Sequence, residues 1–412
     1  MKRIFVFLVC MLLIIAIFSA NTLSLEKSKI IDKEGSSDLF GVFPIDESID
    51  TDVFVYDAVL EDLPPTLDWR NVDDEDWTTP IKDQIQDACG SCWAFGALAA
   101  LESNVKIWAD DPNLDVDLSE QYMLSCSPGD CGGWYWSFTM SWLKNNGAIP
   151  ESCMPYEADD TIPCDDKCSE WRNLLVGIDS YNKVSSNVSA IKTALVEYGP
   201  LGASMDVYGD FYPNFDGGVY RYEYGDYVFG HCIAIVGYDD SWGGEDEGYW
   251  ICKNSWGPNW GEDGWFRIAY GECKIEKGVY YYTGPNYPAE KPEAIAGPTT
   301  GIPGEEYTYT AIGFDPDGDK IKYCFDWGEG NTSWSNLVSS GEAVSIEYSW
   351  PEEGTYELRV KLKDEHGLES DWSDSLSVTI PRFRLPDNSI FEKIIMKLFQ
   401  FLDKFYCNFV SS

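Results

Sequence analysis

Histidine and basic residues are scarce in this chain of 412 residues, and both shortages exclude classes of function. The chain contains 2 His, and its 29 Lys and Arg stand against 70 Asp and Glu, which gives a formal net charge of −41. A field of this sign repels nucleic acid and anionic membrane surfaces. We therefore predict no nucleic-acid partner, and we interpret the acidity as a heavily solvated surface rather than a set of cation sites.

Long apolar runs are absent after the first twenty residues, so no later segment is expected to span a membrane. Near the start, Lys2 and Arg3 precede an apolar run over 4–18. This run is short for a bilayer span but typical of an export signal. We expect a signal peptide over 1–20 and a secreted or cell-surface protein. An uncleaved anchor is the alternative, because Phe18 fits a cleavage site poorly.

Cysteine, in contrast, is plentiful, at 13 residues. Export would place these residues in an oxidising compartment, where disulfides persist. Zinc binding is the competing interpretation, but no second pair at zinc-finger spacing follows Cys89 and Cys92, and the two His supply few further ligands. Disulfides together with one reactive thiol explain the cysteines better, and no metal site is expected.

Composition and periodicity divide the remainder of the chain. Helical spacing over 93–102 is followed by strand-like segments at 232–238 and 264–268, which predicts a helical lobe, a β lobe and a cleft between them. Short alternating runs separated by Gly and Asp turns then continue to residue 380 and favour a small β-sandwich. The predicted parts are a signal peptide over 1–20, a short pro-region over 21–63, a two-lobe domain over 64–284, a linker over 285–291, a β-sandwich over 292–380 and an amphipathic helix over 381–412.

Cys92 is the candidate nucleophile of the two-lobe domain. It opens the helix expected from Trp93 onward, so its sulfur would lie in the positive field of a helix N-terminus, which lowers the pKa of a thiol. Its backbone amide would face a developing oxyanion. Taken alone, Cys89 and Cys92 are equally compatible with a redox pair or with two structural half-cystines, so the choice depends on a base elsewhere in the chain.

The choice of base is narrow, because the chain has two His. His231 begins the expected strand in the second lobe, whereas His366 lies in a polar turn of the β-sandwich. Further along the chain, Asn254 can orient an imidazole through its amide oxygen, and Trp256 can shield that hydrogen bond from water. A lone buried His is more often a core residue, but Cys, His and Asn in this order favour nucleophilic catalysis.

Three segments resemble the papain-like cysteine peptidases: Cys-Gly-Ser-Cys-Trp-Ala-Phe at 89–95, Gly-His-Cys-Ile-Ala-Ile-Val-Gly-Tyr at 230–238 and Lys-Asn-Ser-Trp-Gly at 253–257. The likeness runs from about 63 to 282, roughly half of the chain. It implies an α+β, papain-like two-lobe fold, in which a helical lobe faces a β-barrel-like lobe. It also implies a cysteine-type peptidase, an endopeptidase by preference, that uses no cofactor and acts on protein or peptide substrates.

The resemblance also assigns roles at the site. Cys92 would be the nucleophile, His231 the general base and acid, and Asn254 the orienting group, with a thioester acyl-enzyme as intermediate. The family uses a Gln upstream of the Cys as second oxyanion donor, and here the sequence departs from the pattern. Gln84 matches the local motif, whereas Gln86 has the family spacing to Cys92. We prefer Gln84, with the extra residues bulging out.

Substrate-binding residues are implied more coarsely. Gly132 and Gly133 resemble the family's glycine pair, whose backbone pairs with an extended peptide. Trp134 follows and would wall an apolar subsite, with an ordinary core aromatic as the equal alternative. Ser204 and Phe229 fall where the family lines that same pocket.

The resemblance implies the disulfides Cys89–Cys131 and Cys126–Cys164, and Cys153–Cys168 is a plausible local addition. Each would stabilise the fold by ~2–4 kcal/mol. Cys252 with Cys273 is a further candidate pair. The family's long helical pro-region is missing, so a short apolar segment over 39–44 is the candidate inhibitory strand.

The predicted β-sandwich resembles a polycystic-kidney-disease (PKD) domain over about 292–380, through Asp-Pro-Asp-Gly-Asp at 315–319 and Phe-Asp-Trp-Gly-Glu-Gly at 325–330. Such modules attach enzymes to cell surfaces or polymers. Asp315, Asp317 and Asp319 could hold Ca²⁺, but Lys320 stands where an EF-hand loop needs Gly, so a tight acidic turn is favoured. The rival function for the whole chain is an exported binding or adhesion protein whose papain-like lobe is inactive.

Overall fold

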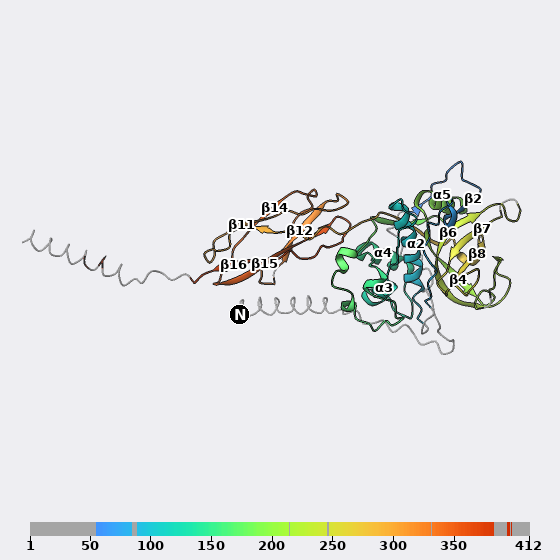
Figure 1. Ribbon diagram of the computed structural model, residues 1–412, viewed down its shortest axis with the longest axis horizontal. Helices are drawn as coiled ribbons and strands as arrows, with labels where there is room; N and C mark the ends of the chain where they lie inside the picture. The colour runs from blue at the N-terminus through green and yellow to red at the C-terminus, as the bar shows by residue number, and fades with distance from the viewer. Residues whose placement is uncertain are drawn as a thin grey trace, which may run out of the picture. The chain divides into compact units, whose positions relative to one another are not determined.

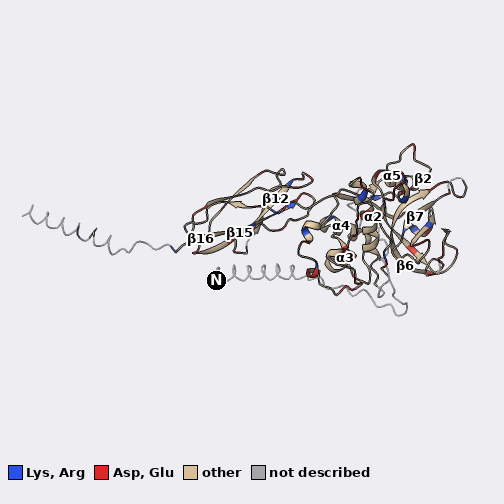
Figure 2. Ribbon diagram, viewed as in Figure 1, with Lys and Arg blue, Asp and Glu red and all other residues tan. Residues whose placement is uncertain are grey.

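A computed structural model describes residues 55–84, 89–213, 215–244, 247–330 and 332–382, with positions 394, 395 and 397 (Figure 1). The predicted signal peptide, most of the predicted pro-region and most of the predicted C-terminal helix lie outside the described residues. Within the described ranges, no helix combines the length and the apolar character that crossing a bilayer requires. Basic positions are few along the described ribbon, as the composition requires (Figure 2).

Three helices form the helical lobe: α2 (Cys92–Trp108), α3 (Glu120–Cys126) and α4 (Trp136–Asn146). The first two turns of α2 carry only small and apolar residues and are buried, so other elements pack on all of their faces. Helix α3 begins where Ser119 Oγ accepts a hydrogen bond from the Tyr122 backbone N–H (2.9 Å). Helix α4 ends at Gly147, whose φ of 65° favours glycine.

The β lobe is a nine-stranded sheet with the order β1-β3-β9-β4-β6-β7-β8-β5, and β2 pairs with β6 off this path. Helix α5 (Val188–Tyr198) accompanies it, and the 13-residue strand β6 pairs with both β4 and β7. The strands are β1 (Val55–Tyr56), β2 (Thr66–Asp68), β3 (Ser180–Val184), β4 (Leu201–Tyr208), β5 (Val219–Tyr220), β6 (Tyr227–Asp239), β7 (Tyr249–Lys253), β8 (Trp265–Ala269) and β9 (Gly278–Thr283). Short 3-10 helices lie at Trp69–Asn71, Glu151–Cys153, Cys164–Asp166, Trp171–Leu174 and Glu272–Lys274.

The two lobes meet where β6 crosses α2. A Cβ added at Gly96 of α2 would lie 2.9 Å from the Cys232 backbone and Cβ, so only glycine allows this approach. Side chains alternate along a strand. Strand β6 therefore gives Cys232, Ala234 and Val236 to the core around α2. It gives Phe229, Ile233, Ile235 and Tyr238 to the core of the β lobe.

The last part of the chain forms the two antiparallel sheets of a β-sandwich, with the orders β10-β11-β14 and β13-β12-β15-β16. Their inward side chains build a separate core around the fully buried Tyr323, Phe325 and Trp350. The strands are β10 (Ile295–Ala296), β11 (Tyr307–Ala311), β12 (Ile321–Asp326), β13 (Thr332–Trp334), β14 (Val344–Tyr348), β15 (Gly354–Asp364) and β16 (Leu376–Ile380). An α+β part followed by an all-β sandwich confirms the predicted fold class.

Candidate active site

Cys92 is the first residue of α2 and is 2% exposed. The first backbone N–H groups of an α-helix have no partner within the helix, so they present positive partial charge beside the sulfur. Burial by itself would raise the pKa of Cys92. Hydrogen bonds from Cys232 and His231, and the charge of His231, outweigh it and lower the pKa of Cys92 well below its ordinary value. The sulfur is therefore poised as a thiolate.

His231 lies inside β6, 1% exposed, with its side chain hydrogen-bonded to Cys92. Its Nε2 lies 2.7 Å from Oδ1 of Asn254. An amide oxygen only accepts, so Nε2 carries a proton and Nδ1 is the nitrogen left for Cys92. The Trp256 ring stacks on the imidazole with centroids 4.5 Å apart, which shields the His231–Asn254 hydrogen bond from water.

Gln84 lies beside the asparagine segment and is 3% exposed. Its backbone N–H donates to the Ser255 carbonyl at 2.8 Å, and its Oε1 accepts from Ser255 Oγ at 2.5 Å. With Oε1 fixed in this way, Nε2 is the amide group free to donate to an oxyanion. Gln86, the alternative, lies outside the described residues.

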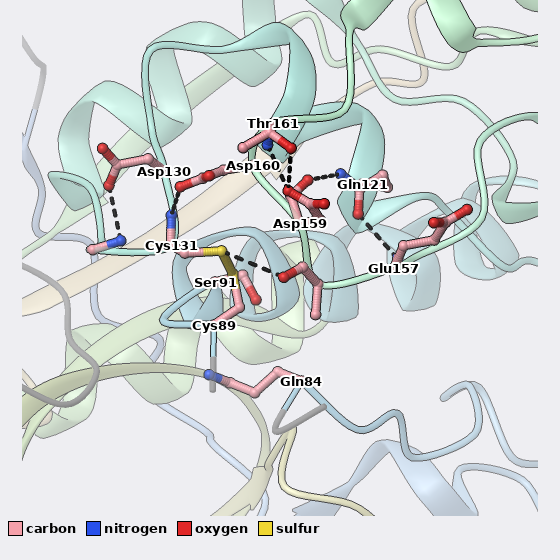
Figure 3. The surroundings of a disulfide bond; sticks show 12 residues. Gln84, Cys89, Ser91, Gln121, Asp130, Cys131, Glu157, Asp159, Asp160 and Thr161 are labelled. Atoms are coloured by element: carbon pink, nitrogen blue, oxygen red, sulfur yellow. Dashed lines mark hydrogen bonds between the residues drawn. A yellow bond between two sulfur atoms is a disulfide. The ribbon is translucent and has the colours of Figure 1, made fainter. Parts of the chain in front are cut away.

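A disulfide anchors the chain just before Cys92 (Figure 3). Cys89 is bonded to Cys131, and the Cys131 backbone N–H donates to the Asp160 carboxylate at 2.9 Å. Cys126–Cys164 and Cys153–Cys168 are the other disulfides among the described residues, so these are the three pairs expected above. The candidate pairing of Cys252 with Cys273 is wrong, because both thiols are free and buried.

Cys232 is a residue of the site that sequence reasoning missed. It is fully buried, and its side chain hydrogen-bonds to that of Cys92. Burial, this hydrogen bond and the negative charge of Cys92 all raise the pKa of Cys232 well above its ordinary value. Cys232 therefore stays a neutral thiol that donates to the Cys92 thiolate. Its position directly after His231 was the available signal, but the helix that it faces follows only from the fold.

The structure does not bring all of the expected substrate-binding residues together in one pocket. Gly133 has a φ of 114°, a conformation that favours glycine, and Trp134 packs edge-on against Trp93 at 5.2 Å. Strand pairing sets Ser204 opposite Cys232, whereas Phe229 lies two residues before His231. Cross-strand partners share a face and residues two apart share a face. Ser204 and Phe229 therefore occupy opposite faces of the β4–β6 pair, and the structure does not place them in one pocket.

Buried charges support the asparagine segment from behind. Lys253, directly before Asn254, is 3% exposed and donates to Thr79 Oγ1 at 2.6 Å. Glu102 of α2 lies 3.8 Å from Lys253 and 2.8 Å from Lys82. Burial lowers the pKa of Lys253 to about 8 despite the opposing effect of Glu102. These contacts tie β7 to α2 on the side away from solvent.

Comparisons with known proteins match the two parts of the chain separately. The model of the papain family cysteine proteases matches residues 63–283, more than half of the chain, and the PKD domain model matches residues 294–376. Cathepsin B-like CP2 of Giardia intestinalis is 36% identical over 236 residues, which covers 53% of this chain and 74% of the relative. Cathepsin B-like cysteine proteinase 6 of Caenorhabditis elegans is 35% identical over 263 residues, which covers 53% and 66%.

Among solved structures, proCathepsin B S9 from Trypanosoma congolense matches with a TM-score of 0.50 at 24% identity, covering 60% of this chain and 87% of that one. This likeness supports the fold alone. The family match spans both lobes and every residue of the site described above. The chain belongs to the papain family of cysteine proteases and carries a PKD domain after the peptidase part.

Proposed function

We propose that this cysteine peptidase hydrolyses peptide bonds through a thioester acyl-enzyme formed on Cys92. The observation that carries the proposal is the hydrogen-bonded series Cys92, His231 and Asn254, buried where α2 meets β6. The Cys92 thiolate attacks the scissile carbonyl, and the C–N bond breaks as His231 protonates the leaving amine. Water, deprotonated by His231, then attacks the thioester and releases the acid product and the thiol.

The charge that develops on the carbonyl oxygen needs donors already in place. The free N–H groups at the start of α2 include that of Cys92, and Gln84 supplies a side-chain amide held by Ser255. Asn254 keeps the proton of His231 on Nε2 throughout the cycle. In this scheme Gly132 and Gly133 offer backbone to an extended substrate, which favours cleavage within chains over cleavage at their ends.

We further propose that the enzyme is exported and that its sandwich, taken as 292–380, attaches the peptidase, taken as 64–284, to a cell surface or polymer. The three disulfides fit an oxidising compartment. The apolar start of the sequence and the PKD match agree with that placement.

A thiol-directed epoxide probe separates the peptidase from an inactive binding protein. We expect the probe to label the full chain once, at Cys92, and to abolish hydrolysis of a peptide library. Cys92→Ser should lose both labelling and hydrolysis, whereas Cys252→Ala, a buried free thiol elsewhere, should keep both. A folded wild-type chain that takes up no label and cleaves no peptide would establish the binding-protein alternative.

Paired variants decide which glutamine serves the oxyanion. Gln84→Ala should lower kcat by ~10²–10³, the usual loss for one oxyanion donor, while Gln86→Ala leaves kcat nearly unchanged. Gln84→Glu keeps the size but replaces the donor, so it should behave like Gln84→Ala. The reverse pattern would transfer the role to Gln86.

A further inference from the structure

Three carboxylates converge in the turn that connects β11 to β12 of the sandwich. Asp315, Asp317 and Asp319 each offer an oxygen, and these oxygens all lie within 4.8 Å of one another. The turn closes through a hydrogen bond from the Gly318 N–H to the Asp315 carbonyl, with Gly318 at φ 81°. The site lies outside the catalytic residues, and the peptidase mechanism does not use it.

Asp315 carries a carboxylate oxygen that has no hydrogen-bond partner among the described residues. The residue is 7% exposed, and its Oδ1 accepts the Asp317 and Asp319 backbone N–H groups at 3.0 and 3.1 Å. Its Oδ2 is buried, and no donor for it exists among the described residues. A buried carboxylate oxygen without a partner is costly, so its orientation calls for a ligand.

The neighbouring groups do not neutralise the cluster. Among the described ion pairs, no Lys or Arg reaches any of the three carboxylates. His366 Nε2 lies 3.3 Å from Asp319 Oδ2. Asp317 Oδ2 accepts from the Tyr287 backbone N–H at 2.7 Å.

We propose that the Asp315–Asp319 turn binds one Ca²⁺ ion, with Asp315 Oδ2 and the carboxylates of Asp317 and Asp319 as ligands. Ca²⁺ takes oxygen ligands at about 2.3–2.6 Å, so ligands on opposite sides of the ion stand up to about 5 Å apart, which fits this cluster. Mg²⁺ needs a tighter octahedron and keeps more of its water, so it fits less well.

Lys320 does not oppose this site, although it argued against an EF-hand loop at the level of sequence. The chain reverses at Gly318, two residues earlier, so the glycine that an EF-hand needs at the Lys320 position is not required here. The tight acidic turn and the cation site are therefore the same structure. An ion bound there would hold the β11–β12 connection closed and stabilise the sandwich.

Calorimetric titration of CaCl2 into the full chain tests the proposal. The protein would carry Cys92→Ser to prevent self-digestion, and it would be stripped with a chelator and measured in 150 mM NaCl. We expect one saturable site with a Kd of ~10⁻⁴–10⁻³ M or tighter, and MgCl2 should bind at least tenfold more weakly. The melting temperature should rise with CaCl2 and return when chelator is added.

Two variants on that background locate the site. Asp317→Asn keeps an oxygen for the Tyr287 N–H but removes a charge, and it should weaken Ca²⁺ binding at least tenfold. Glu347→Gln removes an exposed acid on β14 of the same domain, away from the turn, and should bind like the parent. Equal binding by both variants, or only weak binding that never saturates, would show ordinary attraction of Ca²⁺ to an acidic surface and overturn the proposal.

Discussion

At the scale of single residues, the reactivity of Cys92 depends on two donors, one of which the sequence did not predict. His231 supplies the expected imidazole, and Cys232 adds a neutral thiol held in the core beside α2. A donor to a thiolate favours the charged form and so lowers the pKa of the group that it serves. The second thiol therefore acts as a positioning residue, since it does not touch the substrate in the proposed reaction.

Cys232→Ala should therefore raise the pKa of Cys92. Below the folded pKa the thiolate is lost, so the acidic limb of kcat/KM against pH should move to higher pH, while activity near pH 8 changes little. Cys232→Ser keeps a donor and should restore the parent profile, and Cys252→Ala is the control for removal of a buried thiol. If Cys232→Ala does not shift the pH profile of kcat/KM, Cys232 does not lower the pKa of Cys92.

The sequence predicted part of the site at this scale. Cys92, His231 and Asn254 stand in recognisable segments, and the structure brings them together with Gln84. Two features could not be predicted from the sequence: the role of Cys232, and the separation of Ser204 from Phe229. Each follows from the register between β4 and β6 and from which face of β6 packs on α2. Register is set by long-range pairing, which local sequence does not reveal.

At the scale of elements, the close crossing of α2 and β6 sets the distance between nucleophile and base. Helix α2 was predicted from its small residues, but the need for glycine at position 96 appears only when β6 is in place. The same holds for strand order, since β6 pairs with β2, a segment that lies far earlier in the chain.

Gly96→Ala should push α2 and β6 apart, because its Cβ would meet the Cys232 backbone at 2.9 Å. We expect a loss of ~1–3 kcal/mol in the free energy of unfolding and a fall in kcat, both measurable on the purified full chain. Gly244→Ala is a matched control, since among the described residues its added Cβ would touch only the Glu247 side chain, at 3.8 Å. Equal unfolding energies for the two variants would contradict the close-packing account.

Two carboxylates that pair with Lys82, one buried and one exposed, allow a second comparison of stability. Glu102 and Asp117 both pair with Lys82, at 2.8 and 2.7 Å, but Glu102 is 1% exposed and Asp117 is 57% exposed. Glu102→Gln leaves Lys82 with Asp117 and Glu120 but removes the carboxylate that faces the buried ammonium of Lys253. This variant should cost ~3–5 kcal/mol in urea unfolding, whereas Asp117→Asn should cost ~0–1 kcal/mol. Similar losses for both variants would mean that the buried position has no special weight.

At the scale of the whole molecule, the charge of −41 opposes compactness. Repulsion among exposed carboxylates is screened over ~8 Å at 0.15 M salt and over ~3 Å at 1 M salt. The melting temperature of the Cys92→Ser chain, in chelator, should therefore rise by ~2–4 °C or more between 10 mM and 1 M NaCl, as ~1 kcal/mol of repulsion is removed. Choline chloride at the same concentrations should raise the melting temperature by a similar amount. A melting temperature that falls with either salt would contradict this account.

The rate of Cys92 alkylation as a function of pH tests the central claim, a thiolate stabilised beside His231, most directly. The folded pKa of Cys92 is lowered, so the wild-type rate should stay nearly level well below ~8.5, the pKa of an ordinary thiol. In His231→Ala the alkylation rate should begin to fall at a higher pH than it does in the wild type. A wild-type rate that follows an ordinary thiol, unchanged by His231→Ala, would contradict the account.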